Sequence, residues 1–373
     1  MRRWIWTLAL LTMLSGCTST GPEARDNQFE IGGRSTVTLT QPTADTARPQ
    51  IISVDLLPGR GMNIFQIRAN LPGKGVVDLL TSPPIEQAKT DLASDNFGNA
   101  SFSFGGAILA PFANRIRGKL IGDDIETNIN GKTMHLPANW KGKKPGAERH
   151  AMHGLILASP MDITELSSNR DQAVATAELD AGDFTGHWPS KTNLTISATL
   201  NRDWFGFTVT AKNVGDEDLP MGIGWHPYFT LPSGKRAQAR VKIPARQRAL
   251  VNNYDDVFPT GELVPVGDFF DQPLGDRYID DCFVDLERSA TGEAVAEIID
   301  PEAKYGLRVH ALSPEISAFQ MYSPPDKSFV AIEPQFNWAD PYGAEWKGRN
   351  TGMKVLKPGE SVTYSVRLEM FVP

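Results

Sequence analysis

One histidine and one glutamate in this chain stand in sequence settings that suit proton transfer. His226 lies in residues 225–229 (Trp-His-Pro-Tyr-Phe), where a turn-forming proline and aromatic side chains give it partly apolar surroundings. Glu333 ends the apolar run of residues 329–332 (Phe-Val-Ala-Ile) and precedes Pro334. An imidazole exchanges protons near pH 7, and partial burial raises the pKa of a carboxyl group toward that range. The two side chains could act as general acid and general base if the fold brings them face to face.

An amide and a guanidinium occur together in residues 110–118 (Ala-Pro-Phe-Ala-Asn-Arg-Ile-Arg-Gly), a mostly apolar string. Burying Asn114 and Arg115 is costly unless partners satisfy their polar groups. The arginine could hold a hydroxyl or ring oxygen of a polar ligand, or it could form a structural pair with a carboxylate. From the pattern alone, both interpretations stay open.

Two further strings carry candidate binding residues. His150 and His153 are three residues apart, but no further ligand lies at useful spacing, so a metal site is not expected. His153 is the better site candidate because Gly154 permits close approach of the backbone, although a lone histidine is more often structural. Asp280 and its neighbour Asp281 lie between apolar residues, and they belong either to a solvated turn or to a ligand site.

Alternating apolar and polar residues recur along the chain, and they predict β-strands almost throughout. Clear examples are residues 194–200, 205–211 and 362–368, with glycine- and proline-containing turns between such runs. With 33 Gly and 27 Pro, long helices are hard to place. We therefore predict an all-β fold, a large antiparallel β-sandwich with few short helices, formed as one domain by residues 50–373.

The first residues resemble a processing segment. A basic start and an apolar stretch too short to span a bilayer (residues 2–14) lead into Leu-Ser-Gly-Cys17, which is typical of a bacterial lipoprotein signal. We predict removal of residues 1–16 and lipid attachment at Cys17, with Thr18 favouring the periplasmic face of the outer membrane. The alternative is an ordinary signal peptide with an incidental cysteine.

Residues 17–49 are rich in Thr, Ser, Gly, Pro and Asp, and they predict a flexible tether with one possible early strand at residues 35–39. Lipid attachment at Cys17 would leave Cys282 unpaired, so no internal disulfide is expected. The formal net charge of −7 argues against nucleic acid as a partner and against a polybasic membrane patch.

Taken in chain order, these strings resemble the aldose 1-epimerase family, the galactose mutarotase type. The matching pieces are Pro-Phe-Ala-Asn114-Arg115-Ile with Gly118, His153-Gly154, Met-Gly-Ile-Gly-Trp-His226-Pro-Tyr-Phe, Asp280-x-x-Phe283 and Glu333-x-Gln335, with a closing strand after Leu-Lys-Pro-Gly-Glu. The resemblance covers roughly Gly75 to the C-terminus. It implies a twisted β-sandwich of many strands with a shallow, open sugar cleft.

The resemblance also implies residue roles. Glu333 would take the proton from the anomeric hydroxyl of a free aldohexose, and His226 would protonate the ring oxygen, so that the ring opens and recloses as the other anomer. A monosaccharide is thus the expected partner, and this chemistry calls for neither a metal nor another cofactor. The residues implied to bind the sugar are Arg115, His153, Asp280, Asn114 and Gln335.

The chain departs from the family pattern in places, which indicates a divergent branch. Leu155 stands where the best-known members have a second glycine, and Pro334 stands where they have threonine. Asp281 follows Asp280 where histidine is common, and the spacing to Phe283 favours Asp280 as the sugar ligand.

Other functions remain possible on the same residues. The main alternative is a non-catalytic carbohydrate-binding lipoprotein, which would need no matched acid and base. An epimerase for phosphorylated hexoses would call for a clustered basic site, for which the sequence offers little. Tryptophans could stack on a pyranose ring, although core packing is their commoner fate; the candidates are Trp188, Trp225 and Trp338.

Overall fold

The computed structural model describes residues 21–43 and 47–373 of the chain. The predicted signal peptide and the predicted lipidation site, Cys17, lie outside the described residues. Within the described part, no helix is long and apolar enough to cross a membrane.

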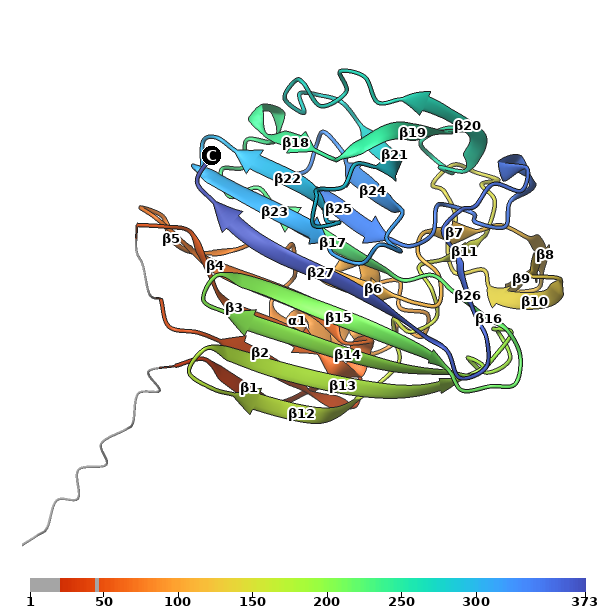
Figure 1. Ribbon diagram of the computed structural model, residues 1–373, viewed down its shortest axis with the longest axis horizontal. Coiled ribbons are helices and arrows are strands. Elements are labelled where there is room, and N and C mark those ends of the chain that lie inside the picture. The colour runs from red at the N-terminus through yellow and green to blue at the C-terminus, as the bar shows by residue number, and fades with distance from the viewer. Residues whose placement is uncertain (1–20, 44–46) are drawn as a thin grey trace, which may run out of the picture.

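Two large antiparallel sheets dominate the structure (Figure 1). The larger has 12 strands in the order β1 (Glu23–Ile31), β2 (Arg34–Thr40), β3 (Gln50–Leu57), β4 (Asn63–Leu71), β6 (Gly106–Leu109), β17 (Gly224–Thr230), β25 (Phe329–Gln335), β24 (Ala318–Ser323), β21 (Ile279–Leu286), β19 (Ala245–Val251) and β20 (Pro259–Pro265), with β5 (Gly75–Asp78) paired to β4.

The second sheet has eight strands and lies across the front of the view in Figure 1. Its order is β12 (Asp162–Ser168), β13 (Gln172–Gly182), β14 (Thr192–Asn201), β15 (Trp204–Asn213), β27 (Ser361–Phe371), β23 (Tyr305–Ala311), β22 (Ala294–Asp300) and β18 (Arg240–Lys242). The sandwich predicted from alternation is therefore confirmed.

Smaller elements complete the fold. Three short sheets are β10 (Lys132–Pro137) with β9 (Asp124–Ile129) and β8 (Lys119–Ile121), β11 (Ala151–Met152) with β7 (Arg115–Ile116), and β16 (Leu219–Met221) with β26 (Lys354–Leu356). The described residues form one α-helix, α1 (Ile85–Leu92), and 3-10 turns at Pro58–Arg60, Ser101–Ser103, Arg236–Gln238 and Ala344–Trp346.

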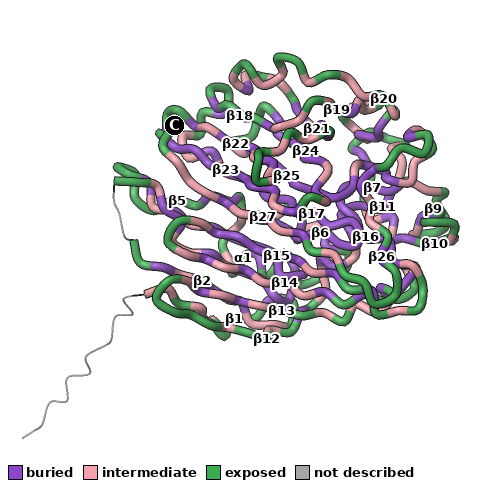
Figure 2. Tube along the Cα trace, in the orientation of Figure 1, coloured by how far each residue is buried: buried purple, intermediate pink, exposed green. Residues whose placement is uncertain are grey.

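The main core lies between the two large sheets. Along β17, Trp225 and Phe229 point into this core and are fully buried, and the Trp225 ring lies 5.2 Å from that of Phe207 on β15. Burying side chains of this size stabilises the fold by about 1.5–3 kcal/mol each. Figure 2 shows the buried residues along the strands, while many of the connecting loops are exposed. The alternate residues of β17, including His226, face away from this core, because successive side chains of a strand point to opposite faces.

The expected tether needs a correction. Residues 23–40 form β1 and β2, two strands of the larger sheet, instead of a flexible segment. The early strand predicted at residues 35–39 is confirmed, because β2 buries Val37 and Leu39. The pattern of β1 gave little signal because it lies at the sheet edge and most of its side chains are polar; of its nine residues, only Ile31 is buried.

Candidate active site

His226 and Glu333 lie opposite each other on two neighbouring strands. In the antiparallel pairing of β17 with β25, Gly224 faces Gln335 and Tyr228 faces Ala331, which places His226 across from Glu333. His226 Nε2 lies 3.3 Å from Glu333 Oε1, and the two side chains are only 6% and 2% exposed. The facing acid and base that the sequence could only suggest are thus in contact.

A cleft of about 540 Å³ opens over this pair. It is lined by six of the residues predicted from the sequence, namely Asn114, Arg115, His153, His226, Asp280 and Glu333. Several buried polar atoms of these residues have no hydrogen-bond partner within the described part of the chain: Asn114 Oδ1, Arg115 Nε, His153 Nδ1, His226 Nδ1 and Glu333 Oε2. Buried polar groups are normally paired, so these atoms are available to bind a polar ligand.

The short sheet of β7 and β11 carries one wall of the cleft. Its pairing sets Met152 against Arg115, and the His153 amide donates a 2.7 Å hydrogen bond to the Asn114 carbonyl. Asn114 and His153 both have positive φ, 61° and 62°, a backbone region that costs non-glycine residues energy and recurs at functional sites. The adjacent Gly154 also has positive φ, and a Cβ there would lie 2.3 Å from the Ala110 carbonyl oxygen, which explains the glycine.

Arg115 places a positive charge within the cleft. Its Nη1 donates to the Val257 carbonyl, which holds the guanidinium in place. Burial lowers the pKa of Arg115, and the carboxyl groups of Asp280 and Glu333 raise it again. The guanidinium is therefore both held in place and electrostatically coupled to the two acids.

Gln320, which the sequence reading missed, joins the two walls of the cleft. It lies on β24 directly opposite Glu333, donates from Nε2 to Asp280 Oδ1 at 2.6 Å, and accepts from Asn114 Nδ2 at 3.1 Å. The signal in the sequence was a single buried amide in the strand Ala318–Ser323 (Ala-Phe-Gln-Met-Tyr-Ser). His226, Glu333 and Gln320 thus form a row across three adjacent strands.

The structure decides between the two adjacent aspartates. Asp280 lines the cleft, and burial raises its pKa to about 6, against the opposing effects of Arg115 and the Gln320 hydrogen bond. Asp281 points elsewhere: it accepts from Arg248 Nη1 at 2.7 Å and from the Tyr254 hydroxyl at 3.1 Å. Asp280 is therefore the aspartate in position to meet a ligand.

Gln335 does not line the cleft, in contrast to the expectation from its motif. It is fully buried two residues beyond Glu333 on the same strand, and its Nε2 lies 3.9 Å from Cys282 Sγ. Since it lies opposite Gly224, the β17 residue two positions before His226, it supports the floor from outside the cleft.

Burial shifts the proton affinities of the central pair in opposite directions. It raises the pKa of Glu333 well above its usual range, with Asp280 adding to the effect and Arg115 opposing it. It lowers the pKa of His226 to about 4, because the imidazolium would be desolvated and Arg115 adds repulsion. Burial and His226 together hold the pKa of His153 well below its usual range. The central pair can therefore hold one proton between its two groups and exchange it across 3.3 Å.

The three candidate tryptophans for sugar stacking lie outside the cleft, in line with core packing as their commoner fate. Trp188 and Trp225 are buried in the core, where their indole nitrogens donate to the carbonyls of Pro220 and Gly106. Trp338 packs on Trp346, and none of the three lines the cleft. The tryptophan at the cleft is Trp140, in a connecting segment whose sequence gave no periodic signal.

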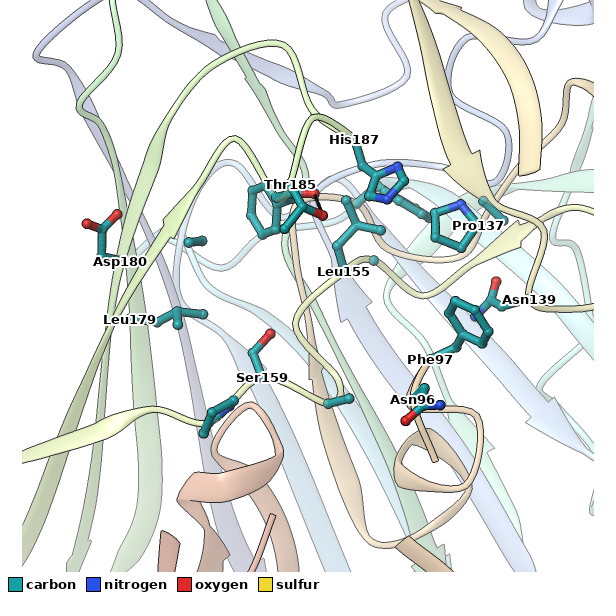
Figure 3. A pocket seen from close by; sticks show the side chains of 17 residues that line it. Asn96, Phe97, Pro137, Asn139, Leu155, Ser159, Leu179, Asp180, Thr185 and His187 are labelled. Atoms are coloured by element: carbon teal, nitrogen blue, oxygen red, sulfur yellow. Dashed lines mark hydrogen bonds between the residues drawn. The ribbon is translucent and has the colours of Figure 1, made fainter. Parts of the chain in front are cut away.

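A second cavity, of about 440 Å³, is also lined in part by residues 151–155 (Figure 3). Ala151, Gly154 and Leu155 line it, whereas His153 lines the first cleft. Its only titratable lining residues are Asp180 and His187, which Figure 3 shows well apart from each other. The second cavity therefore lacks a facing acid and base.

The pair of histidines at positions 150 and 153 is not part of a larger cluster of possible metal ligands among the described residues. Within residues 21–43 and 47–373, no group of three or more His, Cys, Asp or Glu side chains could hold a metal ion. His150 packs its ring on Phe258 and hydrogen-bonds to the Glu148 carbonyl, so it is a structural neighbour of the site.

Known proteins resemble this chain in both sequence and fold. The sequence profile of the family described as aldose 1-epimerase matches residues 87–369. A curated relative, the uncharacterized protein YphB of Escherichia coli K12, is 29% identical over 272 residues, which cover 70% of this chain and 82% of YphB.

Solved structures of similar fold include a galactose mutarotase-like protein from Clostridium acetobutylicum, with a TM-score of 0.74, 19% identity, and coverage of 95% of this chain and 99% of that one. Galactose 1-epimerase from Lactobacillus acidophilus has a TM-score of 0.65 at 17% identity, covering 94% of this chain and 99% of its own. A putative aldose 1-epimerase from Escherichia coli K12 has a TM-score of 0.60 at 21% identity, covering 87% and 96%.

Proposed function

The chain belongs to the aldose 1-epimerase family, and from that premise we propose that it interconverts the α and β anomers of a free aldohexose by acid/base ring opening. The observation that carries this proposal is the buried contact of 3.3 Å between His226 and Glu333 on the floor of a polar cleft. Carbohydrate binding without catalysis would not require an acid and a base in contact.

The reaction needs one proton removed and one proton supplied. The Glu333 carboxylate accepts the proton of the anomeric hydroxyl while the His226 imidazolium donates to the ring oxygen, so that the bond from C1 to the ring oxygen breaks and an aldehyde forms. Rotation about the C1–C2 bond presents the other face of the carbonyl. The same two groups then act in reverse, and the ring closes as the other anomer with both residues restored.

The charge state of the pair depends on its surroundings. In the free protein, burial favours the uncharged form, in which the proton lies on Glu333. Sugar hydroxyls that donate to the carboxylate, together with the nearby Arg115, stabilise the ionised carboxylate of Glu333. One proton transfer across the existing contact then gives the arrangement that the reaction uses.

Arg115, His153 and Asp280 are proposed to hold the hydroxyls and the ring oxygen of the sugar. All three line the cleft, and Arg115 and His153 have buried nitrogen atoms without a partner among the described residues. Mutarotation already proceeds in water, so positioning and acid/base assistance of about 10²–10⁴-fold would suffice.

Polarimetry of freshly dissolved α-glucose and α-galactose tests the proposal directly. The purified full-length protein should accelerate the change in optical rotation, and Glu333→Gln or His226→Asn should reduce that acceleration at least about a hundredfold. His187→Asn, in the second cavity, is the matched control and should retain the wild-type rate. Sugar binding without any acceleration would instead favour the non-catalytic, carbohydrate-binding alternative.

We further propose that lipid on Cys17 anchors the protein to the periplasmic face of the outer membrane. The support is the sequence of residues 1–18 alone, with its short apolar stretch and its Leu-Ser-Gly-Cys string.

A further inference from the structure

Exposed aromatic side chains gather at the mouth of the cleft. Of the described residues, four large aromatics are exposed: Phe97, Trp140, Tyr254 and Tyr278. Trp140, Tyr254 and Tyr278, which are 38%, 43% and 38% exposed, line the cleft, and we call these three residues the aromatic rim. Exposed apolar surface that is concentrated at one cavity indicates a binding surface rather than chance exposure.

The rim is connected to the reactive pair by rings in contact. On one side, the Phe102 ring lies 6.0 Å from that of His226 and 5.2 Å from that of Trp140. Phe102 is 4% exposed and Trp140 is 38% exposed, so this row of rings runs from the buried floor to the solvent. Trp140 thus lies two ring contacts from the imidazole.

The other wall has a parallel arrangement. The Tyr278 ring packs on Tyr322 at 6.1 Å and on Tyr254 at 5.2 Å, and Tyr322 contacts Tyr228, the neighbour of His226 on the same strand face. Both walls of the cleft therefore present aromatic surface at their outer ends.

Polar contacts hold the Tyr254 side chain and link the segments that carry Tyr254 and Trp140. The Tyr254 hydroxyl donates to Asp281, which also accepts from Arg248. The segment that carries Trp140 is tied to the segment that carries Tyr254, because Asp255 accepts from the backbone amides of Lys143 and Lys144. An aromatic side chain held as Tyr254 is loses little conformational freedom on binding.

The proposed reaction fixes the direction of the bound sugar. Since C1 and the ring oxygen must meet Glu333 and His226, the reducing end of the sugar points to the buried floor. The opposite side of the pyranose ring, with hydroxyls that can carry a further sugar, then points to the mouth. A second ring attached there would lie at the level of the aromatic rim, whose faces suit the C–H face of a pyranose.

We infer that the aromatic rim is a subsite for the second ring of an oligosaccharide whose reducing-end unit occupies the cleft over His226 and Glu333. This inference rests on the proposed ring-opening function for the orientation of the first ring. It assigns to the protein a substrate class with a free reducing end and at least two sugar rings.

The test compares glucose with glucose-terminated disaccharides of different linkage (maltose, cellobiose and gentiobiose) on the full-length protein. At least one disaccharide should have a kcat/KM about threefold to tenfold above that of glucose. Trp140→Ala should bring that ratio close to one, and Trp140→Phe, which keeps a ring, should preserve most of it. Phe97→Ala, an exposed aromatic of the second cavity, is the matched control and should leave the ratio unchanged.

Calorimetric titration of the Glu333→Gln protein with the same sugars separates the two proposals. Tighter binding of a disaccharide than of glucose supports the subsite if this difference is lost when Trp140→Ala is added to Glu333→Gln. That result holds even if no sugar shows accelerated mutarotation. Equal affinity and equal kcat/KM for glucose and every disaccharide would overturn the subsite while leaving the ring-opening function intact.

Discussion

Gln320 Nε2 donates a 2.6 Å hydrogen bond to Asp280 Oδ1, and the same amide accepts from Asn114 on the opposite wall of the cleft. A neutral amide thereby orients a carboxyl group without adding charge. Because the hydrogen bond favours the ionised carboxylate, it lowers the pKa of Asp280, which burial has raised to about 6. Gln320 thus influences both the position and the charge of Asp280, a residue proposed to bind the sugar.

The first prediction concerns the acid side of the pH profile. If ionised Asp280 binds the sugar, kcat/KM should fall as the pH drops through about 6. Gln320→Leu should move this fall to higher pH, because a hydrogen bond to the charged carboxylate is lost. The same loss should lower the maximal kcat/KM about tenfold or more. Polarimetric rates from pH 4.5 to pH 9 measure both effects. An acid limb that is unchanged in Asp280→Asn would assign it to another group.

The second prediction concerns Asp340, which hydrogen-bonds to the backbone of the segment that carries Arg115. Its amide donates to the Arg115 carbonyl at 2.8 Å, its Oδ1 accepts from the Arg117 amide at 3.0 Å, and burial raises its pKa to about 7. Since this value lies above the usual 3.8, the folded state binds the extra proton between these limits. The contribution of Asp340 to stability therefore falls as the pH rises from about 4 to about 7.

Asp340→Asn removes that ionisation while keeping an acceptor oxygen. We expect it to match the wild type near pH 4 and to exceed it by about 1–2 kcal/mol in the free energy of unfolding at pH 8. Urea unfolding at the two pH values measures the difference. Asp216→Asn, at an exposed site, serves as the control and should show no such pH dependence. A loss of stability at pH 8 in Asp340→Asn would contradict the expectation.

The third prediction separates backbone strain from steric conflict at two glycines. Gly154 and Gly186 both have positive φ, 81° and 86°. A Cβ atom added at Gly154 would lie within 4 Å of backbone atoms of Ala110, whereas one added at Gly186 would have no neighbour within 4 Å. Gly186→Ala should cost about 1 kcal/mol, whereas Gly154→Ala should cost at least about 3 kcal/mol and reduce activity, because it displaces His153. Thermal unfolding and polarimetry give the two readouts. Similar losses in both variants would show that the contact with Ala110 is relieved at little cost.

The fourth prediction tests the anchor. In a bacterial host, Cys17→Ser should move the protein from the membrane fraction to the soluble fraction and abolish labelling with radioactive palmitate. Cys282→Ser, a buried site in the fold, should change neither. Persistent membrane association of the unlabelled Cys17→Ser protein would point to another mode of attachment.

The strands and the main site residues could be predicted because their signals are local. Alternation marks β14 and β27, a polar residue in an apolar string marks His226 and Glu333, and the family resemblance with its spacing to Phe283 marks Asp280 of the two adjacent aspartates. That these three residues meet depends on strand order, because β17, β21 and the consecutive strands β24 and β25 are neighbours in the sheet, although β17, β21 and the β24–β25 pair lie far apart in the chain. Strand order follows from long-range packing, which one sequence does not display.

The misses have physical causes of the same kind. Gln320 resembled any polar residue of a strand, and Trp140 lies in a connecting segment without periodicity. Gln335 shares a motif and a strand face with Glu333, yet it lies two residues further along β25, outside the cleft. In each case, what decides the role of a side chain is the neighbour across the sheet rather than the neighbour in the sequence.

The pairing of β17 with β25 also has a consequence for any preparation of this protein. A slip of one residue between these strands would turn Glu333 toward the core and an apolar neighbour toward the cleft, because side chains alternate strictly along a strand. Such a slip would disrupt the packing of Trp225 and Phe229 in the same step. No well-folded but misregistered form is therefore available, and the specific activity of a refolded sample should report its fraction of native molecules.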